Sequence, residues 1–222
     1  QVSEIFESRL LLTFVGIDFG GGSVPTNWTS YSGSANASFP DLKDEDNNNS
    51  GISAVITRDT SPGGAVSFTP QAVTLPQHTQ SLAGVDRIYQ DQSGNIELNW
   101  GNLTPGGVYE MYVFGGNEVA GNPRVTITGS SVITFGQAYQ ADKLFVNDQI
   151  GDSSRTLSSY AKLMTADASG HIVVRVDTGN GVLYFGTAGM AIRAVVPTNQ
   201  APVITSDLGG PTAAITVAEN QT

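Results

Sequence analysis

The sequence predicts an all-β protein: a β-sandwich of the jelly-roll type with an extended strand segment at its C-terminus. Charged residues make up only 14% of the chain, against about 25% in an average globular protein. Glycine, serine, threonine and asparagine take their place, which is typical of a chain rich in turns and strands. About a dozen short strand patterns follow one another with turn signals between them, and no window has the period of a long amphipathic helix.

The first half of the chain alternates apolar strand patterns with polar loops. Residues 10–19 form an apolar run that ends at three glycines, which stop a strand. Residues 32–50 and 69–84 are polar or proline-containing, and we expect loops there. The other strands expected in this half are residues 25–31, 52–57, 65–68 and 95–100.

The second half contains the most apolar strand pattern. Residues 108–114 (VYEMYVF) are almost all apolar or aromatic, which predicts a central strand. Asn180-Gly181 is a strong hairpin signal, because both residues tolerate the positive φ that a type I′ turn needs. The other strands expected here are residues 124–128, 132–135, 144–146, 157–165, 171–177, 182–185 and 190–196, with a turn at 167–170.

Three segments follow from this pattern: an N-terminal arm (1–9), a β-sandwich domain (10–196) and a C-terminal segment (197–222). Residues 212–218 (TAAITVA) alternate as a strand does, yet the sequence offers them no partner strand. An unpaired strand is a template for pairing with another chain. We therefore expect Ile215 and Val217 to take part in assembly, either within a following repeat or in a neighbouring subunit.

The net charge of −10 and the absence of cysteine exclude several classes of function. A phosphate backbone would be repelled, so no nucleic-acid partner is expected. Disulfides and thiolate metal sites are excluded. The apolar run 10–17 has about half the length of a membrane-spanning helix, so no membrane span is expected.

Four runs resemble a jelly-roll module of secreted bacterial multidomain proteins that is similar to the galactose-binding-like sandwich. They are FVGIDFGGGSVPTNW, NIELNWGNLTPGGVYEMYVFGG, TADASGHIVVRV and LYFGTAGMAIRAV, and together they extend over about residues 14–195. The resemblance implies an accessory, non-catalytic domain that is extracellular or on the cell surface.

The C-terminal segment resembles the start of a bacterial cadherin-like repeat. Asn199 and Pro202 match the linker between repeats, and Glu219-Asn220 matches the family's E-N motif. The resemblance implies that Glu219 is a calcium ligand. The acidic residue that usually precedes the linker asparagine is absent here, as is the rest of the repeat.

A second candidate for calcium is the loop DEDNNNSG. Asp44, Asp46 and Asn48 alternate along it, and oxygen ligands at alternate positions are how a loop wraps a calcium ion. The glycine and the distal glutamate of an EF-hand are not in register, so a solvated acidic loop is the other interpretation. Calcium is the one cofactor that the sequence suggests.

Six aromatic residues offer a candidate surface for stacking on sugar rings: Trp28, Tyr31, Trp100, Tyr109, Tyr112 and Tyr139. Trp28 lies beside a glycine-rich loop and is the better exposed candidate, with Asn117 and Glu118 as polar partners. The alternative is that these aromatic residues pack in the core, since aromatic side chains favour strands.

No catalytic constellation is complete. Asp177-Thr178-Gly179 occurs once, whereas aspartic proteases need two such carboxylates, and Ser159 and Lys162 match S-x-x-K without its companion motifs. We expect no enzyme. We expect an extracellular structural or adhesive module of a bacterial protein, with further domains or other copies of itself as partners, including a filament joined by strand exchange. The alternative is a carbohydrate-binding module that stacks aromatic side chains on glycans.

Overall fold

A computed structural model describes residues 14–20, 24–32, 36–58, 65–67, 86–90, 94–116, 121–140, 143–152, 154–179 and 185–195, the ranges 65–67 and 86–90 by their backbone alone. All of them belong to one compact unit, Leu12–Val195. The second unit, Gln1–Leu11 with Val196–Thr222, lies outside the described residues, and so do the predicted arm and C-terminal segment.

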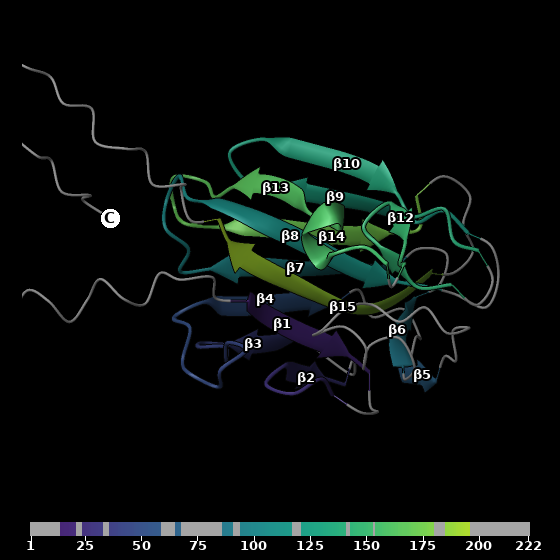
Figure 1. Cartoon of the computed structure of the whole chain (residues 1–222), viewed down its shortest axis with the longest axis horizontal. Coiled ribbons are helices and arrows are strands. Elements are labelled where there is room, and N and C mark those ends of the chain that lie inside the picture. Colours follow the sequence, from purple (N-terminus) through teal and green to yellow (C-terminus); the bar gives the residue numbers. More distant parts are fainter. Residues whose placement is uncertain are drawn as a thin grey trace, which may run out of the picture. The chain divides into compact units, whose positions relative to one another are not determined.

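The prediction of an all-β sandwich is confirmed, because the described strands form two sheets (Figure 1). The larger sheet has nine strands, in the order β12-β11-β8-β15-β1-β2, with β13 also paired to β8, β6 paired to β15, and β5 paired to β6. Its strands are β1 (Phe14–Phe19), β2 (Thr29–Tyr31), β5 (Ala65–Ser67), β6 (Asp86–Gln90), β8 (Val108–Gly115), β11 (Phe145–Val146), β12 (Gln149–Ile150), β13 (Lys162–Thr165) and β15 (Phe185–Ala194).

The smaller sheet has six strands in the order β10-β9-β14-β7-β4-β3, and every neighbouring pair is antiparallel. Its strands are β3 (Ala37–Phe39), β4 (Ser53–Arg58), β7 (Asn95–Gly101), β9 (Arg124–Thr128), β10 (Val132–Gly136) and β14 (Ile172–Asp177). A short 3₁₀ helix, η3 (Leu157–Tyr160), precedes β13.

The main core lies between the two sheets and follows from period-2 alternation. In β7, the side chains of Ile96, Leu98 and Trp100 are all 0% exposed, and the residues between them are half-exposed. The same alternation in β4, β9 and β14 gives the six-stranded sheet one apolar face and one polar face. Each buried aliphatic or aromatic side chain contributes about 2 kcal/mol by leaving water. A slip of one residue would turn these side chains to the solvent face, so their burial fixes the register of the sheet.

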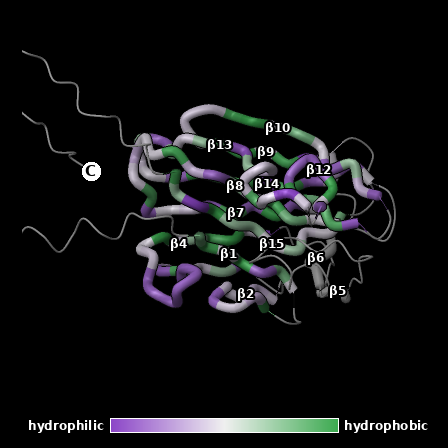
Figure 2. Tube along the Cα trace, viewed as in Figure 1, coloured by the Kyte–Doolittle hydropathy of each residue, from purple (hydrophilic) through white to green (hydrophobic). Residues whose placement is uncertain are grey.

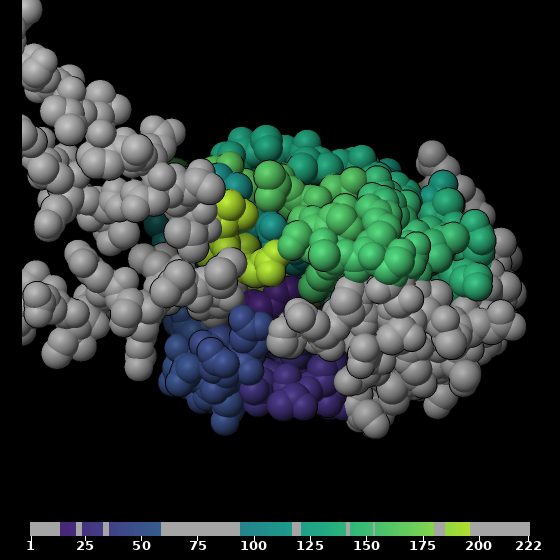
Figure 3. Space-filling view, in the orientation of Figure 1, coloured from purple at the N-terminus to yellow at the C-terminus, as the bar shows by residue number. Residues whose placement is uncertain are grey.

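The nine-stranded sheet is covered on its other face as well. A second cluster lies there, made of Phe14, Trp28, Tyr112, Phe114, Leu144, Val146, Tyr160, Ala188 and Ala191. In Figure 3, green atoms of the chain around η3 lie over the middle of this face. Strand β8 therefore has apolar neighbours on both sides, which explains its nearly unbroken apolar sequence and confirms its central position.

One edge of β8 is shared by two short strands. Strand β11 pairs with Phe114 and Gly115, and β13 pairs with residues 108–111. The side chain of Asn147 fills the gap: its Oδ1 accepts from the Val113 N–H at 2.9 Å, and its Nδ2 donates to the Met111 carbonyl at 2.9 Å. The buried amide thus takes the place of a neighbouring strand.

Most strand predictions are confirmed, but β6 and β12 were not predicted, and three other segments differ. The strand predicted over 157–165 is wrong in its first half, where the chain forms η3 and buries Tyr160 in the outer cluster. The loop predicted over 32–50 contains β3, which pairs with β4. The strand predicted at 190–196 is part of the ten-residue β15, which begins at Phe185 and passes a β-bulge between Thr187 and Gly189. The rest of the strand predicted at 182–185 and the Asn180-Gly181 turn lie outside the described residues.

Candidate functional site

The outer surface of the six-stranded sheet is the best candidate for a functional site. Alternate residues of its strands point away from the core, and we call this surface the polar face. Its residues are Ser38, Ser53, Val55, Thr57, Asn95, Glu97, Asn99, Gly101, Arg124, Thr126, Thr128, Val132, Thr134, Gly136, Val173, Arg175 and Asp177.

Strand register arranges these residues in rows across the sheet. One row runs from β4 to β10 and consists of Thr57, Glu97, Arg175, Thr126 and Thr134. The next row consists of Asn95, Asp177, Arg124 and Gly136. Side chains directly opposite each other on neighbouring strands lie about 5 Å apart. The first row is therefore a continuous line of hydrogen-bonding groups, and the second is one from Asn95 to Arg124.

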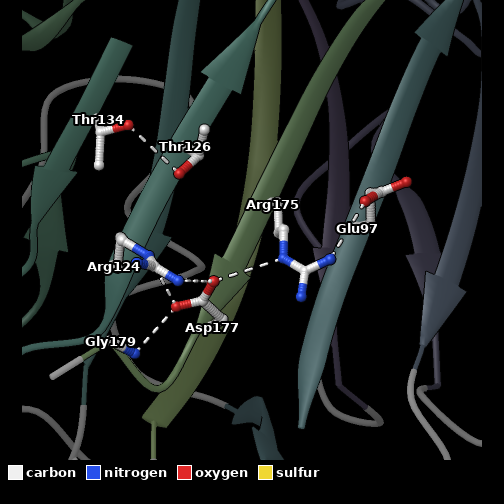
Figure 4. A network of polar contacts seen from close by, with 7 residues as sticks. All are labelled: Glu97, Arg124, Thr126, Thr134, Arg175, Asp177 and Gly179. Carbon is white, nitrogen blue, oxygen red and sulfur yellow. Dashed lines mark hydrogen bonds and ion pairs between the residues drawn. The ribbon is translucent and has the colours of Figure 1, made fainter. Parts of the chain in front are cut away.

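A charged network joins the two rows (Figure 4). Arg124 donates to Asp177 through Nε at 3.1 Å and through Nη2 at 2.9 Å, a bidentate pair. Arg175 bridges the rows: its Nε lies 3.4 Å from Asp177 Oδ2, and its Nη1 lies 3.7 Å from Glu97 Oε2. At the end of the row, Thr126 and Thr134 bring their hydroxyl oxygens within 3.4 Å of each other.

Asp177 holds the network together. Its side chain is 12% exposed, whereas those of Arg124 and Arg175 are 52% and 45% exposed. Burial alone would raise the pKa of the Asp177 carboxyl, but hydrogen bonds from Arg124 and from the Gly179 N–H, with the Arg124 charge, outweigh it, so the pKa lies below its usual range. The carboxylate stays ionised and keeps both guanidinium groups on the surface.

Asn99 lies at the centre of the polar face, between Val55 and Val173. Its Oδ1 is buried and has no hydrogen-bond partner in the described part of the chain. Buried acceptors without partners are rare and call for an explanation. Among the residues of the polar face, Oδ1 of Asn99 is the one such acceptor in the described ranges.

Trp28 does not provide the exposed ring that the sequence suggested. The indole is 9% exposed and packs on the backbone of Gly16, where a Cβ would lie 2.2 Å from the ring. Phe14 and Phe114 pack against it, with ring centroids 5.7 and 5.9 Å away. The other aromatic residues considered for stacking are buried as well: Tyr31, Trp100, Tyr109, Tyr112 and Tyr139. The proposed polar partners, Asn117 and Glu118, lie outside the described residues.

The acidic loop lies between β3 and β4, and its residues 43–49 are all hydrophilic (purple in Figure 2). One oxygen of Asp44 accepts hydrogen bonds from the backbone N–H groups of Asp46 at 3.0 Å and Asn48 at 2.8 Å. This carboxylate therefore closes its own loop. Within the described residues, no three His, Cys, Asp or Glu side chains are grouped to hold a metal ion. Calcium binding at Asp44, Asp46 and Asn48 stays a prediction.

The residues predicted to act in assembly, Ile215 and Val217, and the predicted calcium ligand Glu219 lie outside the described residues. Neither prediction is tested by the fold. The described ranges contain no helix that is both long and apolar enough to cross a membrane.

Residues of the two incomplete catalytic motifs have structural partners. Asp177 belongs to the network of the polar face. Lys162 donates to Asp148 at 2.8 Å, and the Ser159 hydroxyl donates to the Thr156 carbonyl at 2.7 Å.

A second polar cluster lies on the nine-stranded sheet. Arg193 donates to Glu110 at 2.6 Å and to Ser158 at 2.7 Å, and the Tyr112 hydroxyl donates to Glu110 at 2.6 Å. The pKa of Tyr112 is raised, mainly by burial and secondly by its hydrogen bond to Glu110. The cluster connects η3 to the sheet through the hydrogen bond between Arg193 and Ser158, so we assign the cluster a structural role.

No protein-family model matches the sequence, and no curated protein matches it significantly. Some solved structures have a similar arrangement. The enzymatically active domain of tailspike protein 4 of bacteriophage CBA120 aligns with a TM-score of 0.43 and 6% identity, over 64% of this chain and 19% of that chain. A family 35 carbohydrate-binding module from Clostridium thermocellum aligns with a TM-score of 0.34 and 15% identity, over 71% of this chain and 97% of that chain.

The GH26-CBM35 β-(1,4)-mannanase of Podospora anserina aligns with a TM-score of 0.39 and 14% identity, over 80% of this chain and 31% of that chain. The aligned region is thus about a third of the mannanase chain and a fifth of the tailspike chain. All three TM-scores lie below 0.5, so these similarities carry no functional argument.

Sequence reasoning missed the polar face entirely. Most of its members are ordinary polar residues in strands, and no motif joins residues as distant in sequence as Glu97 and Arg175. The available signal was the polar half of each alternating strand, such as Asn95, Glu97 and Asn99 in β7. That alternation shows which side chains point away from the core. It does not show which residues of other strands lie beside them, because that depends on strand order.

Proposed function

We propose that this domain is a non-catalytic module that binds a carbohydrate chain across the polar face. The observation that carries the proposal is the pair of neighbouring rows of hydrogen-bonding side chains on the outer surface of one sheet. A carbohydrate presents many hydroxyl groups that both donate and accept, and the rows offer amides, carboxylates, guanidinium groups and hydroxyls within one surface.

The mode of binding in this proposal is hydrogen bonding in place of aromatic stacking. The six aromatic side chains considered for stacking are buried, whereas Arg124 and Arg175 are about half exposed. Planar guanidinium and carboxylate groups make hydrogen bonds that are both strong and directional, because each group presents two hydrogen-bonding atoms in one plane. The ion pairs to Asp177 hold these planes in place before a ligand arrives, which lowers the entropic cost of binding.

The polar face suits a ligand that lies flat on it. Val55 and Val132 are 45% and 63% exposed, and they give the face short apolar patches in the row beside the two polar rows. Sugar rings have apolar C–H faces as well as hydroxyl edges, so both kinds of surface are useful. An extracellular or cell-surface location goes with this proposal, since carbohydrate polymers are abundant there.

The test uses the intact chain and a panel of soluble neutral and acidic polysaccharides in affinity gel electrophoresis, followed by titration calorimetry with oligosaccharides of any that retard it. Asn99→Ala and Thr126→Ala are expected to weaken binding about tenfold each, which corresponds to about 1.4 kcal/mol. Thr165→Ala, the same change on the nine-stranded sheet, serves as the matched control and should bind as the parent chain does.

Two results would overturn the proposal. One is that the folded chain binds none of the polysaccharides. The other is that a polysaccharide binds but Asn99→Ala and Thr126→Ala bind it as tightly as the parent chain, which would move the site elsewhere.

A further inference from the structure

Strand β10 forms one edge of the six-stranded sheet, and no described strand pairs with its free side. Its five residues, Val132–Gly136, contain no charged residue and no proline. They pair with β9 in unbroken register, with no bulge. Natural sheet edges are usually protected by charge, by proline, by bulges or by shortness, and β10 has none of the first three.

The opposite edge of the same sheet differs. Strand β3 has only three residues and is followed by Pro40 and Asp41. An edge of this kind is a poor template for another strand. Among the described strands, the contrast marks β10 as the edge of this sheet that is open to pairing.

Burial along β10 leaves apolar surface partly uncovered. Val132 is 63% exposed, and Ile133 and Phe135 pack only partly against the core. The Lys162 ammonium lies 5.3 Å from the centre of the Phe135 ring and is paired with Asp148. Another strand added at this edge would cover Ile133 and Phe135 and would satisfy the outward backbone groups of β10.

The sequence of β10 is complementary to itself. Two antiparallel copies overlap over all five residues only when the two-fold axis passes through Thr134. Ile133 then faces Phe135 of the other copy on the core side, twice by symmetry. On the outer side Thr134 faces its own equivalent, and Val132 faces Gly136. Aromatic with β-branched and Thr with Thr are favourable cross-strand pairs, and no like charges meet.

We propose that β10 is a self-association surface, through which two copies of this chain join their six-stranded sheets in one continuous antiparallel sheet about a two-fold axis at Thr134. The symmetric arrangement is the commonest one for homodimers. Five residues extend over only about 17 Å, so the interface is small and the dimer is weak, with a dissociation constant on the order of 100 µM. The proposal is independent of carbohydrate binding. If both hold, the dimer doubles the length of the polar face.

The test introduces charges of opposite sign at Thr134, the residue on the two-fold axis. Self-association of the intact chain is measured by sedimentation equilibrium from about 10 µM to 1 mM, a range that brackets the expected dissociation constant. Thr134→Lys and Thr134→Glu each place like charges opposite each other in a homodimer, so each variant alone should be monomeric. An equimolar mixture should dimerise again, at least as well as the parent chain. Thr57→Lys, on the same face but on β4, is the matched control and should dimerise normally.

The proposal is overturned if the parent chain stays monomeric up to 1 mM. It is equally overturned if the parent dimerises but the mixture of Thr134→Lys and Thr134→Glu stays monomeric, or if either variant alone dimerises as the parent does. The last result would show that association uses another surface.

Discussion

Asn147 and Trp28 each fix one part of the nine-stranded sheet. Asn147 is fully buried with φ at 54°, a left-handed conformation that asparagine tolerates better than most residues. Besides its two bonds to β8, its Nδ2 donates to the Tyr160 carbonyl at 2.7 Å. Trp28 lies flat against Gly16, where no larger residue fits. In both cases one side chain joins segments that are distant in sequence.

Replacing Asn147 with alanine is expected to lower the free energy of unfolding by about 3 kcal/mol. The change leaves the Val113 N–H and the carbonyls of Met111 and Tyr160 buried without partners, and each such group costs about 1–3 kcal/mol, partly offset by relaxation. Urea unfolding followed by circular dichroism measures the loss. Asn147→Gly is the control for backbone strain, because glycine accepts positive φ. A loss below about 1 kcal/mol in both variants would show that the hydrogen bonds matter little.

Strands were predictable from the sequence where one face of the strand is buried and the other is exposed to solvent. Ile96, Leu98 and Trp100 alternate with polar residues, and the structure places β7 there. The first half of residues 157–165 was not predictable, because Tyr160 is buried by an outer cluster whose other members come from distant strands. The same cluster buries Trp28, which the nearby glycines suggested was exposed. Local patterns give strands, but partners across a sheet depend on register, so the rows of the polar face were not predictable.

The β14–β9 pair should make stability depend on acid. The folded pKa of Asp177 is lowered, so its contribution is present above the unfolded value of about 3.9 and is lost as the pH falls through the folded value. Asp177→Asn is expected to lower the free energy of unfolding at pH 7 by about 1 kcal/mol, allowing for solvent around Arg124. Below about pH 3 the difference from the parent should shrink.

Urea titrations at pH 7, 5, 4 and 3 measure this difference. The parent and the Asp177→Asn chain should both still lose stability in acid, because the pKa values of Asp148, Asp152 and Asp167 are lowered too. Glu97→Gln, at the exposed end of the network, is the control and should change stability by less than about 0.5 kcal/mol. An Asp177→Asn effect that stays constant from pH 7 to 3 would contradict the assigned ionic role.

The two sheets and their two apolar clusters share strands. Strand β8 contributes Met111 and Val113 to the core between the sheets, and Tyr112 and Phe114 to the outer cluster. The same division occurs in β15. Because one strand cannot leave one cluster without disturbing the other, the described unit should unfold as a single cooperative body.

The chain's two tryptophans test this cooperativity, since Trp100 lies in the core and Trp28 in the outer cluster. Trp28→Phe and Trp100→Phe give two chains with one tryptophan each, whose fluorescence is excited selectively. Phenylalanine suits Trp100, whose Nε1 has no hydrogen-bond partner in the described ranges. Within each variant, fluorescence and circular dichroism should give the same urea midpoint and slope. A Trp28 signal lost well before the circular dichroism would mean that the outer cover opens first.

The way β11 and β13 share one edge of β8 also matters for protein engineering. After β12, which pairs with β11, the chain leaves the sheet and returns at Lys162, so both ends of this excursion are fixed by strand pairing. Its tip includes Ser154, which is exposed. A foreign peptide spliced in there would lengthen a loop whose ends are already fixed, and each doubling of loop length costs only about 0.6 kcal/mol. It would emerge from the sheet opposite the polar face, so the domain can serve as a display scaffold without obstructing that face.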